Sequence, residues 1–113
     1  MIIGVGDIYT QIPRRDAVRA LMSRTEANVR QQPGCISYVF AETLDDPGHF
    51  VVVQQWRDQA AVEEHYRSPA FLEYQEQIAD LLVRSSELRL HSVAESFRPV
   101  DPSVPSAPAT QED

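Results

Sequence analysis

The chain alternates between stretches in which apolar side chains recur at every second residue and stretches in which they recur at every third or fourth. The first spacing is typical of strands and the second of amphipathic helices. Strands are predicted at residues 1–12, 35–43, 50–56 and 87–97, and helices at 13–32 and 59–83, the latter interrupted at Ser68. This order of strand, helix, strand, strand, helix, strand predicts an α+β fold of the ferredoxin-like split βαβ type (βαββαβ), with a four-stranded antiparallel sheet.

Turn and cap residues stand where these elements meet. The sequence Asp-Asp-Pro-Gly at residues 45–48 predicts a hairpin turn, since proline presets φ and glycine tolerates positive φ. Asp58 and Ser68 are predicted helix N-caps, and Pro69 falls in the first turn of the second helical segment. Pro33 and Gly34 end the first long helix.

Both faces of the predicted sheet are apolar. Val51 and Val53 alternate with Phe50 and Val52, so apolar side chains point to either side of the third strand. Helices cover only one face of a ferredoxin-like sheet. The other face has room for the ~800 Å² per subunit of a standard interface, which predicts a homodimer with the sheets packed face to face.

Composition and charge narrow the class of protein. A chain of 113 residues predicts one domain that buries about two thirds of its unfolded surface. The net charge of −7 and the absence of lysine argue against a nucleic-acid partner. No run approaches the ~20 apolar residues of a membrane span, and the N-terminal residues lack a secretory pattern, which predicts a cytoplasmic protein with no membrane partner.

The ends of the chain differ in composition. Residues 1–97 are predicted to form the domain, and residues 98–113, which hold four of the eight prolines, are predicted to be a disordered tail. The single cysteine excludes an intramolecular disulfide and a cysteine-based zinc site, and no metal site is predicted.

Two side chains suggest chemistry. Trp56 shares one side of its strand with Phe50, Val52 and Gln54, and His65 follows on the next helix. The two converge if that helix covers the tryptophan-bearing face. Each alone is more often core packing, at odds of about three to one for the tryptophan. A third candidate, the Asp7 carboxylate within an apolar strand, lies either at an exposed edge or in a pocket.

Several motifs occur together in residues 1–97: Pro-Gly-Cys at 33–35, Tyr38, the acidic turn at 45–48, FVVVQQW at 50–56, AAVEEHY at 60–66 and SPAF at 68–71. In this combination the chain resembles the antibiotic biosynthesis monooxygenase family of dimeric α/β barrels. The resemblance implies a cavity between sheet and helices, and oxygenation of quinols or aromatic polyketides without metal, flavin or haem. Polyketide-oxidising members carry an amide near the tryptophan, where this chain has Val52 and Gln54. The haem-degrading branch has an asparagine where this chain has Asp7, which argues against haem.

From these observations the sequence predicts a cofactor-independent monooxygenase that oxidises a quinol or a polyketide-type phenol with O₂. His65 is the candidate general base, and Trp56 the candidate donor to an oxyanion and platform for an aromatic ring. Tyr38 and Asp7 are candidates for orienting the phenol. The predicted substrate-binding residues are Gln54, Val52, Phe50, Val62, Tyr66 and Phe71. Two alternatives stay open: a non-enzymatic, aromatic-ligand-binding or stress-associated dimer, and a cofactor-free isomerase or cyclase on the same barrel.

Overall fold

A computed structural model describes residues 1–99. The elements in chain order are β1 (Ile2–Tyr9), a short 3₁₀ helix η1 (Ile12–Arg14), α1 (Arg15–Val29), β2 (Cys35–Glu42), β3 (His49–Trp56), α2 (Gln59–Arg67), α3 (Pro69–Ala79) and β4 (Glu87–Ser92). The predicted ferredoxin-like α+β fold is confirmed. Nearly all of the predicted tail, from residue 100 onward, lies outside the described residues.

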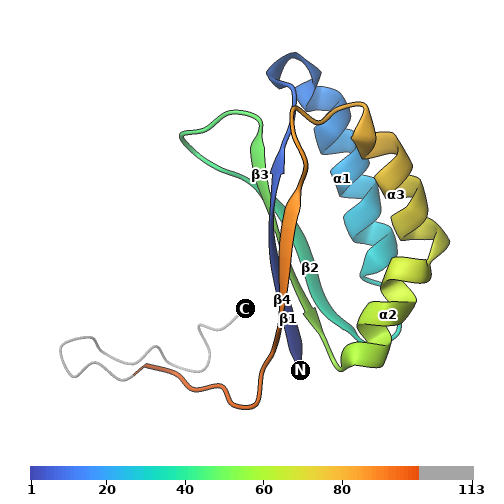
Figure 1. The fold of residues 1–113 in the computed structure, drawn as a ribbon, viewed down its shortest axis with the longest axis vertical. Coiled ribbons are helices and arrows are strands. Elements are labelled where there is room, and N and C mark those ends of the chain that lie inside the picture. Colours follow the sequence, from blue (N-terminus) through green and yellow to red (C-terminus); the bar gives the residue numbers. More distant parts are fainter. Residues whose placement is uncertain (100–113) are drawn as a thin grey trace, which may run out of the picture.

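The four strands form one antiparallel sheet in the order β2-β3-β1-β4, and all the α-helices lie against one of its faces (Figure 1). Strand β1 is central, with Gly4 opposite Gln54 and Gly6 opposite Val52 on β3. Because side chains alternate along a strand, Gln54 and Val52 point toward the helices, and Val5 and Val53 point to the uncovered face.

The predicted caps and turns are present. Asp58 accepts a hydrogen bond from the Ala61 backbone N–H at 2.9 Å, and Ser68 accepts one from that of Phe71 at 3.2 Å. Gly34 and Gly48 have φ of 80° and 84°, in the region that favours glycine. These local signals place α2 and α3 directly after the β2–β3 hairpin.

Several element ends differ from the predictions. Strand β1 stops at Tyr9, three residues before its predicted end. Helix α1 begins at Arg15, after the 3₁₀ helix η1, rather than at residue 13. Helix α3 stops at Ala79 rather than continuing to residue 83. Strand β4 ends at Ser92 rather than at residue 97 because its antiparallel partner β1 begins at that point: Ser92 pairs with Ile2, and the last backbone bond joins the Val93 N–H to the Met1 carbonyl.

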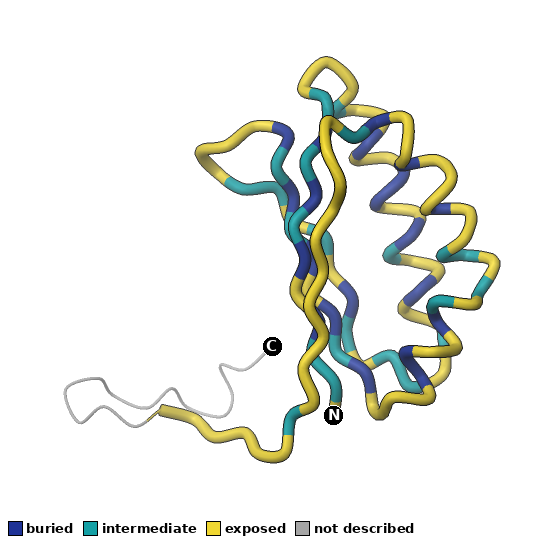
Figure 2. The backbone as a smooth tube through the Cα atoms, viewed as in Figure 1, coloured by how far each residue is buried: buried dark blue, intermediate teal, exposed yellow. Residues whose placement is uncertain are grey.

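The core lies between the sheet and the helices, and the helix-facing side chains of the central strands are buried (Figure 2). The uncovered face exposes Val5, Val39 and Val53 at 45%, 41% and 38%. Apolar residues therefore occupy both faces, as predicted. No helix among residues 1–99 combines the length and apolar content needed to cross a bilayer.

Candidate functional site

A cavity of about 360 Å³ lies between the helix-facing side of the sheet and α3. Five aromatic side chains contribute to its wall, and residues 85–88 border it where the chain enters β4. The lining residues are Ile8, Tyr38, Phe40, Val52, Gln54, Tyr66, Phe71, Tyr74, Gln75, Ile78, Ala79, Leu82, Ser85, Ser86, Glu87 and Leu88. A mostly apolar and aromatic wall with a few polar groups suits a small planar ligand.

Gln54 links the cavity to the tryptophan behind it. Its side chain is 1% exposed, and its Oε1 accepts a hydrogen bond from Trp56 Nε1 at 2.8 Å. Because the amide oxygen faces the indole, the amide NH₂ of Gln54 points the other way and donates to the oxygen of Tyr66. Trp56 is fully buried and does not line the cavity, so its N–H is already used within the protein.

Gly4 gives Gln54 the space it occupies on the sheet. A Cβ added at Gly4 would lie 2.8 Å from both Gln54 Cγ and Leu90 Cδ2, too close for a real contact. The glycines of β1 therefore lie beneath larger side chains of neighbouring strands. An alanine at position 4 would displace the amide that holds Tyr66.

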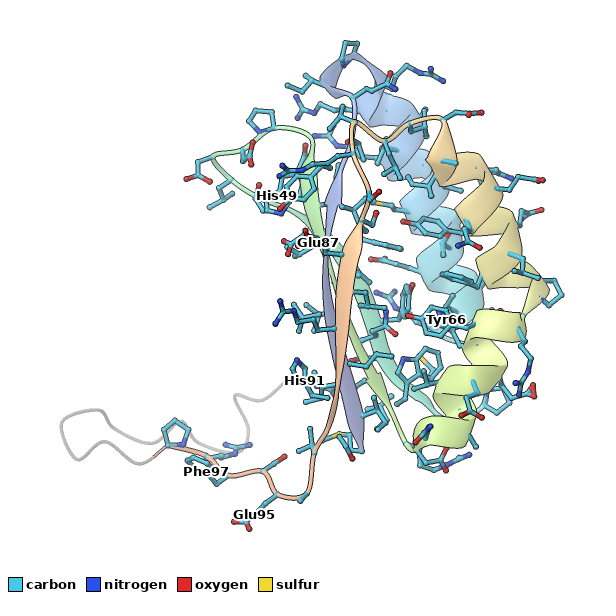
Figure 3. All side chains as sticks on the ribbon, viewed as in Figure 1. His49, Tyr66, Glu87, His91, Glu95 and Phe97 are labelled. Atoms are coloured by element: carbon cyan, nitrogen blue, oxygen red, sulfur yellow. The ribbon has the colours of Figure 1, made fainter. Side chains whose placement is uncertain are left out.

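Tyr66 projects from α2 into the space between helices and sheet (Figure 3). Burial raises the pKa of Tyr66, and the hydrogen bond from Gln54 acts in the opposite direction. Since its oxygen accepts from Gln54, its own O–H is available to donate to a ligand in the cavity. Burial also raises the pKa of Tyr38 and of Tyr74, so these two phenols are neutral donors as well.

His65 has a defined tautomer. Its Nδ1 lies 2.9 Å from Gln32 Oε1, and the Gln32 amide is oriented by donating to Ser68 Oγ at 3.0 Å. Nδ1 therefore carries the proton, and Nε2 keeps a lone pair. His65 is 1% exposed, and Nε2 has no hydrogen-bond partner among residues 1–99. Burial lowers the pKa of His65 to about 4, so the imidazole is neutral at neutral pH.

Aromatic rings enclose this imidazole. Its centroid lies 4.8 Å from that of Trp56, 4.7 Å from Tyr66, 5.1 Å from Phe71 and 5.4 Å from Tyr38. The predicted convergence of Trp56 and His65 is thus present. The last three rings line the cavity, whereas His65 and Trp56 do not. The candidate base lies one layer of side chains behind the cavity wall.

Asp7 lies on the opposite face of the sheet. Its Oδ1 is 2.8 Å from Nε2 of His49, whose Nδ1 is 3.4 Å from Asp46 Oδ2. Figure 3 shows His49 on the side away from the helices. The structure therefore separates Asp7 from the cavity residues.

The remaining predicted residues divide into two groups. Two of them, Phe50 and Val62, are buried elsewhere in the core. The other five line the cavity: Val52, Gln54, Tyr66, Phe71 and Tyr38. Apart from Phe71, the sequence reasoning missed the wall contributed by α3 and the following loop. A helical stripe of residues 71, 74, 78 and 82 was the available signal, because this spacing places Phe71, Tyr74, Ile78 and Leu82 on one face.

A larger depression of about 560 Å³ lies among the loops at the end of the sheet. Tyr9 stacks on His49 there at 4.6 Å between centroids, and the Arg84 guanidinium lies 3.7 Å from the Tyr9 ring centroid. Its wall consists of strand ends, the 3₁₀ helix and loop residues, none of which belongs to the hydrophobic core, so we assign the candidate site to the aromatic cavity under the helices. Among residues 1–99 no group of three or more His, Cys, Asp or Glu side chains is placed to hold a metal ion.

The fold and the cavity define a class: a ferredoxin-like α+β protein with an aromatic pocket under its helices. The model of the antibiotic biosynthesis monooxygenase family matches residues 1–77, more than half of the chain. The chain belongs to the antibiotic biosynthesis monooxygenase family. Membership supports a monooxygenase activity in general terms and leaves the substrate open.

Individual relatives agree with this assignment. An uncharacterised protein of Synechocystis is 32% identical over 95 residues, which cover 84% of this chain and 65% of that protein, just under two thirds of its length. Rv0793 of Mycobacterium tuberculosis, which carries a provisional monooxygenase name, is 37% identical over 70 residues, or 62% of this chain and 68% of that protein. Its solved structure matches with a TM-score of 0.78 at 27% identity, covering 86% of this chain and 98% of that one. A family structure from Deinococcus radiodurans, at 23% identity, shows the same fold with a TM-score of 0.83 over 89% of this chain and all of that one.

Proposed function

We propose that the protein is a monooxygenase that binds a quinol or a related phenol in the cavity and oxidises it with O₂. The observation that carries this proposal is the aromatic pocket itself, with five aromatic side chains in its wall and the imidazole of His65 behind three of them. Aromatic walls favour a flat aromatic substrate, and a buried lone pair is a base kept free of water.

The chemistry requires that the substrate supply the electrons. When a ring CH₂ of a phenolic substrate becomes C=O, the substrate gives up four electrons, one oxygen atom bonds to carbon, and the other leaves with two hydrogens as water. A phenol becomes a better reductant once it is deprotonated. The protein therefore has two tasks, to accept the phenol proton and to stabilise the oxyanion that remains.

We assign the first task to His65. Its Nε2 carries a lone pair with no hydrogen-bond partner among residues 1–99. Tyr66 and Phe71 both contact the imidazole and line the cavity, so a substrate that displaces one of these rings reaches His65. The pKa of about 4 makes the free imidazole a weak base, and the phenolate formed beside it raises that pKa by ion pairing.

The second task falls to Tyr66, with its O–H as the donor to the oxyanion. Gln54 and Trp56 are positioning residues, because the indole N–H fixes the amide and the amide fixes the tyrosine oxygen. This differs from the sequence-based role of Trp56 as a direct donor. Tyr38 contributes a neutral phenol to the same wall.

The proposal includes a homodimer joined through the uncovered sheet faces, which the exposed valines of β1, β2 and β3 support. A cytoplasmic location stays a prediction from the sequence.

The test is oxygen uptake by the purified full chain with a panel of hydroquinones and anthrone-type phenols, together with mass spectrometry of products formed under ¹⁸O₂. We expect one labelled oxygen per product. His65→Gln should lower turnover by ~10² to 10⁴, the range for a positioned general base, and Tyr66→Phe by ~10² to 10³, the range for one oxyanion donor. Normal turnover per folded molecule in both variants would remove these residues from the mechanism.

A second function, binding of an aromatic ligand without chemistry, is favoured by one observation. The base lies behind the wall rather than on it. If no substrate of the panel consumes oxygen but flat phenols bind and quench the tryptophan fluorescence, the binding function replaces the enzymatic one.

A further inference from the structure

The turn of Pro33 and Gly34 that follows α1 fixes the residue before it. The Gln32 carbonyl accepts a hydrogen bond from the Cys35 N–H at 3.1 Å, and Gly34 has a φ of 80°. Proline at the second position and a glycine with positive φ at the third are the features of a type II β-turn. The Gln32 N–H also donates to the Val29 carbonyl at 2.9 Å. Both backbone groups of Gln32 are therefore bonded, and its side chain starts from a fixed point.

The same turn packs against helix α2 (Figure 1). A Cβ added at Gly34 would lie 2.5 Å from the Cβ of Ala61, which is buried on α2. The Gly34 carbonyl also accepts a hydrogen bond from the Arg57 N–H at 2.8 Å, just before α2 begins. Ala61 and His65 are one helical turn apart and share one face of α2. The close contact at Gly34 therefore brings the turn within reach of the imidazole.

One hydroxyl group decides which end of the Gln32 amide faces His65. Ser68 Oγ donates its hydrogen to the His65 carbonyl at 2.6 Å and accepts a hydrogen bond from the Phe71 N–H at 3.2 Å. Because its only hydrogen is used, Ser68 Oγ can only accept from Gln32, so the group 3.0 Å away is the amide NH₂. The amide oxygen is then left for Nδ1 of His65, 2.9 Å away. Ser68 thus determines, through Gln32, which ring nitrogen carries the proton.

We propose that Gln32 is a positioning residue for the reaction assigned to His65, because its amide oxygen keeps the ring proton on Nδ1 and leaves the Nε2 lone pair to accept a proton from the substrate. The inference rests on the proposed function. In the transfer the O–H bond of the phenol breaks, its electron pair stays on the phenolate oxygen, and the proton bonds to Nε2. A neutral imidazole can carry its proton on either nitrogen, and in the Nε2–H form Nε2 has no lone pair to accept that proton. Gln32 therefore decides whether His65 can act as a base.

An amide fixes the tautomer without adding charge. A carboxylate in the same place would stabilise the imidazolium, as the aspartate of a serine-protease triad does. Burial lowers the pKa of His65 to about 4. The other ionisable side chains that contact the ring are the phenols of Tyr38 and Tyr66, and burial raises the pKa of both. The imidazole therefore stays uncharged, and able to accept a proton, over a wide range of pH.

Nuclear magnetic resonance of the full chain, labelled with ¹⁵N at histidine, measures the tautomer directly. Couplings between the ring nitrogens and the carbon-bound ring protons distinguish an Nδ1–H from an Nε2–H imidazole, and the spectrum of His65→Gln identifies the His65 signals. At neutral pH we expect the Nδ1–H form of His65 in the wild type and population of the Nε2–H form in Gln32→Leu, with the signals of His49 and His91 unchanged. An Nε2–H form in the wild type, or an Nδ1–H form that persists in Gln32→Leu, overturns the proposal.

Two substitutions of Gln32 test its effect on the reaction. Gln32→Glu keeps an oxygen acceptor for Nδ1 and adds a negative charge, whereas Gln32→Leu removes the acceptor. A neighbouring opposite charge raises the pKa of an imidazole by ~1–3 units, so the acid limb of the pH profile of kcat/KM should move upward by that amount in Gln32→Glu. In Gln32→Leu, kcat should fall by ~10² or more, within the ~10² to 10⁴ that a positioned base contributes.

The two variants also separate positioning from a merely structural role, which would affect both alike. Circular dichroism and thermal unfolding establish that both are folded. Wild-type kcat in Gln32→Leu, or an equal loss in both variants with no shift of the pH profile, overturns the proposal. The tautomer measurement needs no substrate, so failure of the enzymatic proposal leaves that test intact.

Discussion

The pH dependence of stability offers a test of the His65 environment that needs no substrate. Burial lowers the pKa of His65 from 6.5 to about 4, so the unfolded chain binds a proton at this residue more readily than the folded one. The stabilisation from the neutral imidazole is therefore complete above pH 6.5 and is lost as the pH falls from 6.5 toward 4. With 1.36 kcal/mol per pKa unit, the free energy of unfolding should fall by roughly 3 kcal/mol across this window.

The assay is urea unfolding of the wild type and of His65→Gln at several values between pH 4.5 and 8. Glutamine cannot titrate, and its amide can still donate to Gln32, so the variant should lack this part of the pH dependence. All other ionisable groups are the same in both proteins, so their contributions cancel in the difference between the two curves. A constant difference across the pH range would refute the buried, uncharged state of His65.

Three further predictions concern other parts of the molecule. Gln54→Leu leaves the Trp56 N–H buried without an acceptor and should cost about 1–3 kcal/mol in urea unfolding, whereas a smaller cost would show that Gln54 does not hold the indole. Val53→Asp places a charge on the uncovered face and should halve the mass measured by sedimentation, and an unchanged mass would argue against the face-to-face dimer. Deletion from Pro99 onward should leave melting temperature and mass unchanged, and a large fall in either would show that the deleted residues contribute to packing.

Much of the fold was predictable because its signals are local. The caps at Asp58 and Ser68 and the positive φ of Gly34 and Gly48 each depend on a few neighbouring residues, and these elements begin or turn as predicted. The end of β4 was not predictable in this way. Alternation continues in the sequence to residue 97, but a strand persists only where a partner strand runs beside it, and β1 begins at Ile2.

The candidate site was only partly predictable. Periodicity correctly placed Trp56, Gln54 and His65 on facing surfaces, because strand and helix faces follow from spacing alone. It could not decide which side chains reach the cavity, since this depends on the depth to which each ring packs between two layers. Asp7 shows the same limit, because its partner His49 is 42 residues away and the pair forms only through the β1–β3 register.

The depth of His65 has a further consequence for the order of events in catalysis. Tyr66 and Phe71 contact each other at 4.7 Å between ring centroids, and both rings line the cavity while His65 behind them does not. Proton transfer to His65 then requires that the bound substrate displace one of these rings. Part of the substrate's binding free energy therefore offsets the cost of moving that ring before the proton is transferred. Tyr66 is held by Gln54, while Phe71 makes ring contacts without a side-chain hydrogen bond and is the ring that can move at lower cost. Phe71→Leu should therefore raise turnover relative to substrate affinity, whereas a fall in both together would show that Phe71 serves as substrate platform rather than as the movable part of the wall.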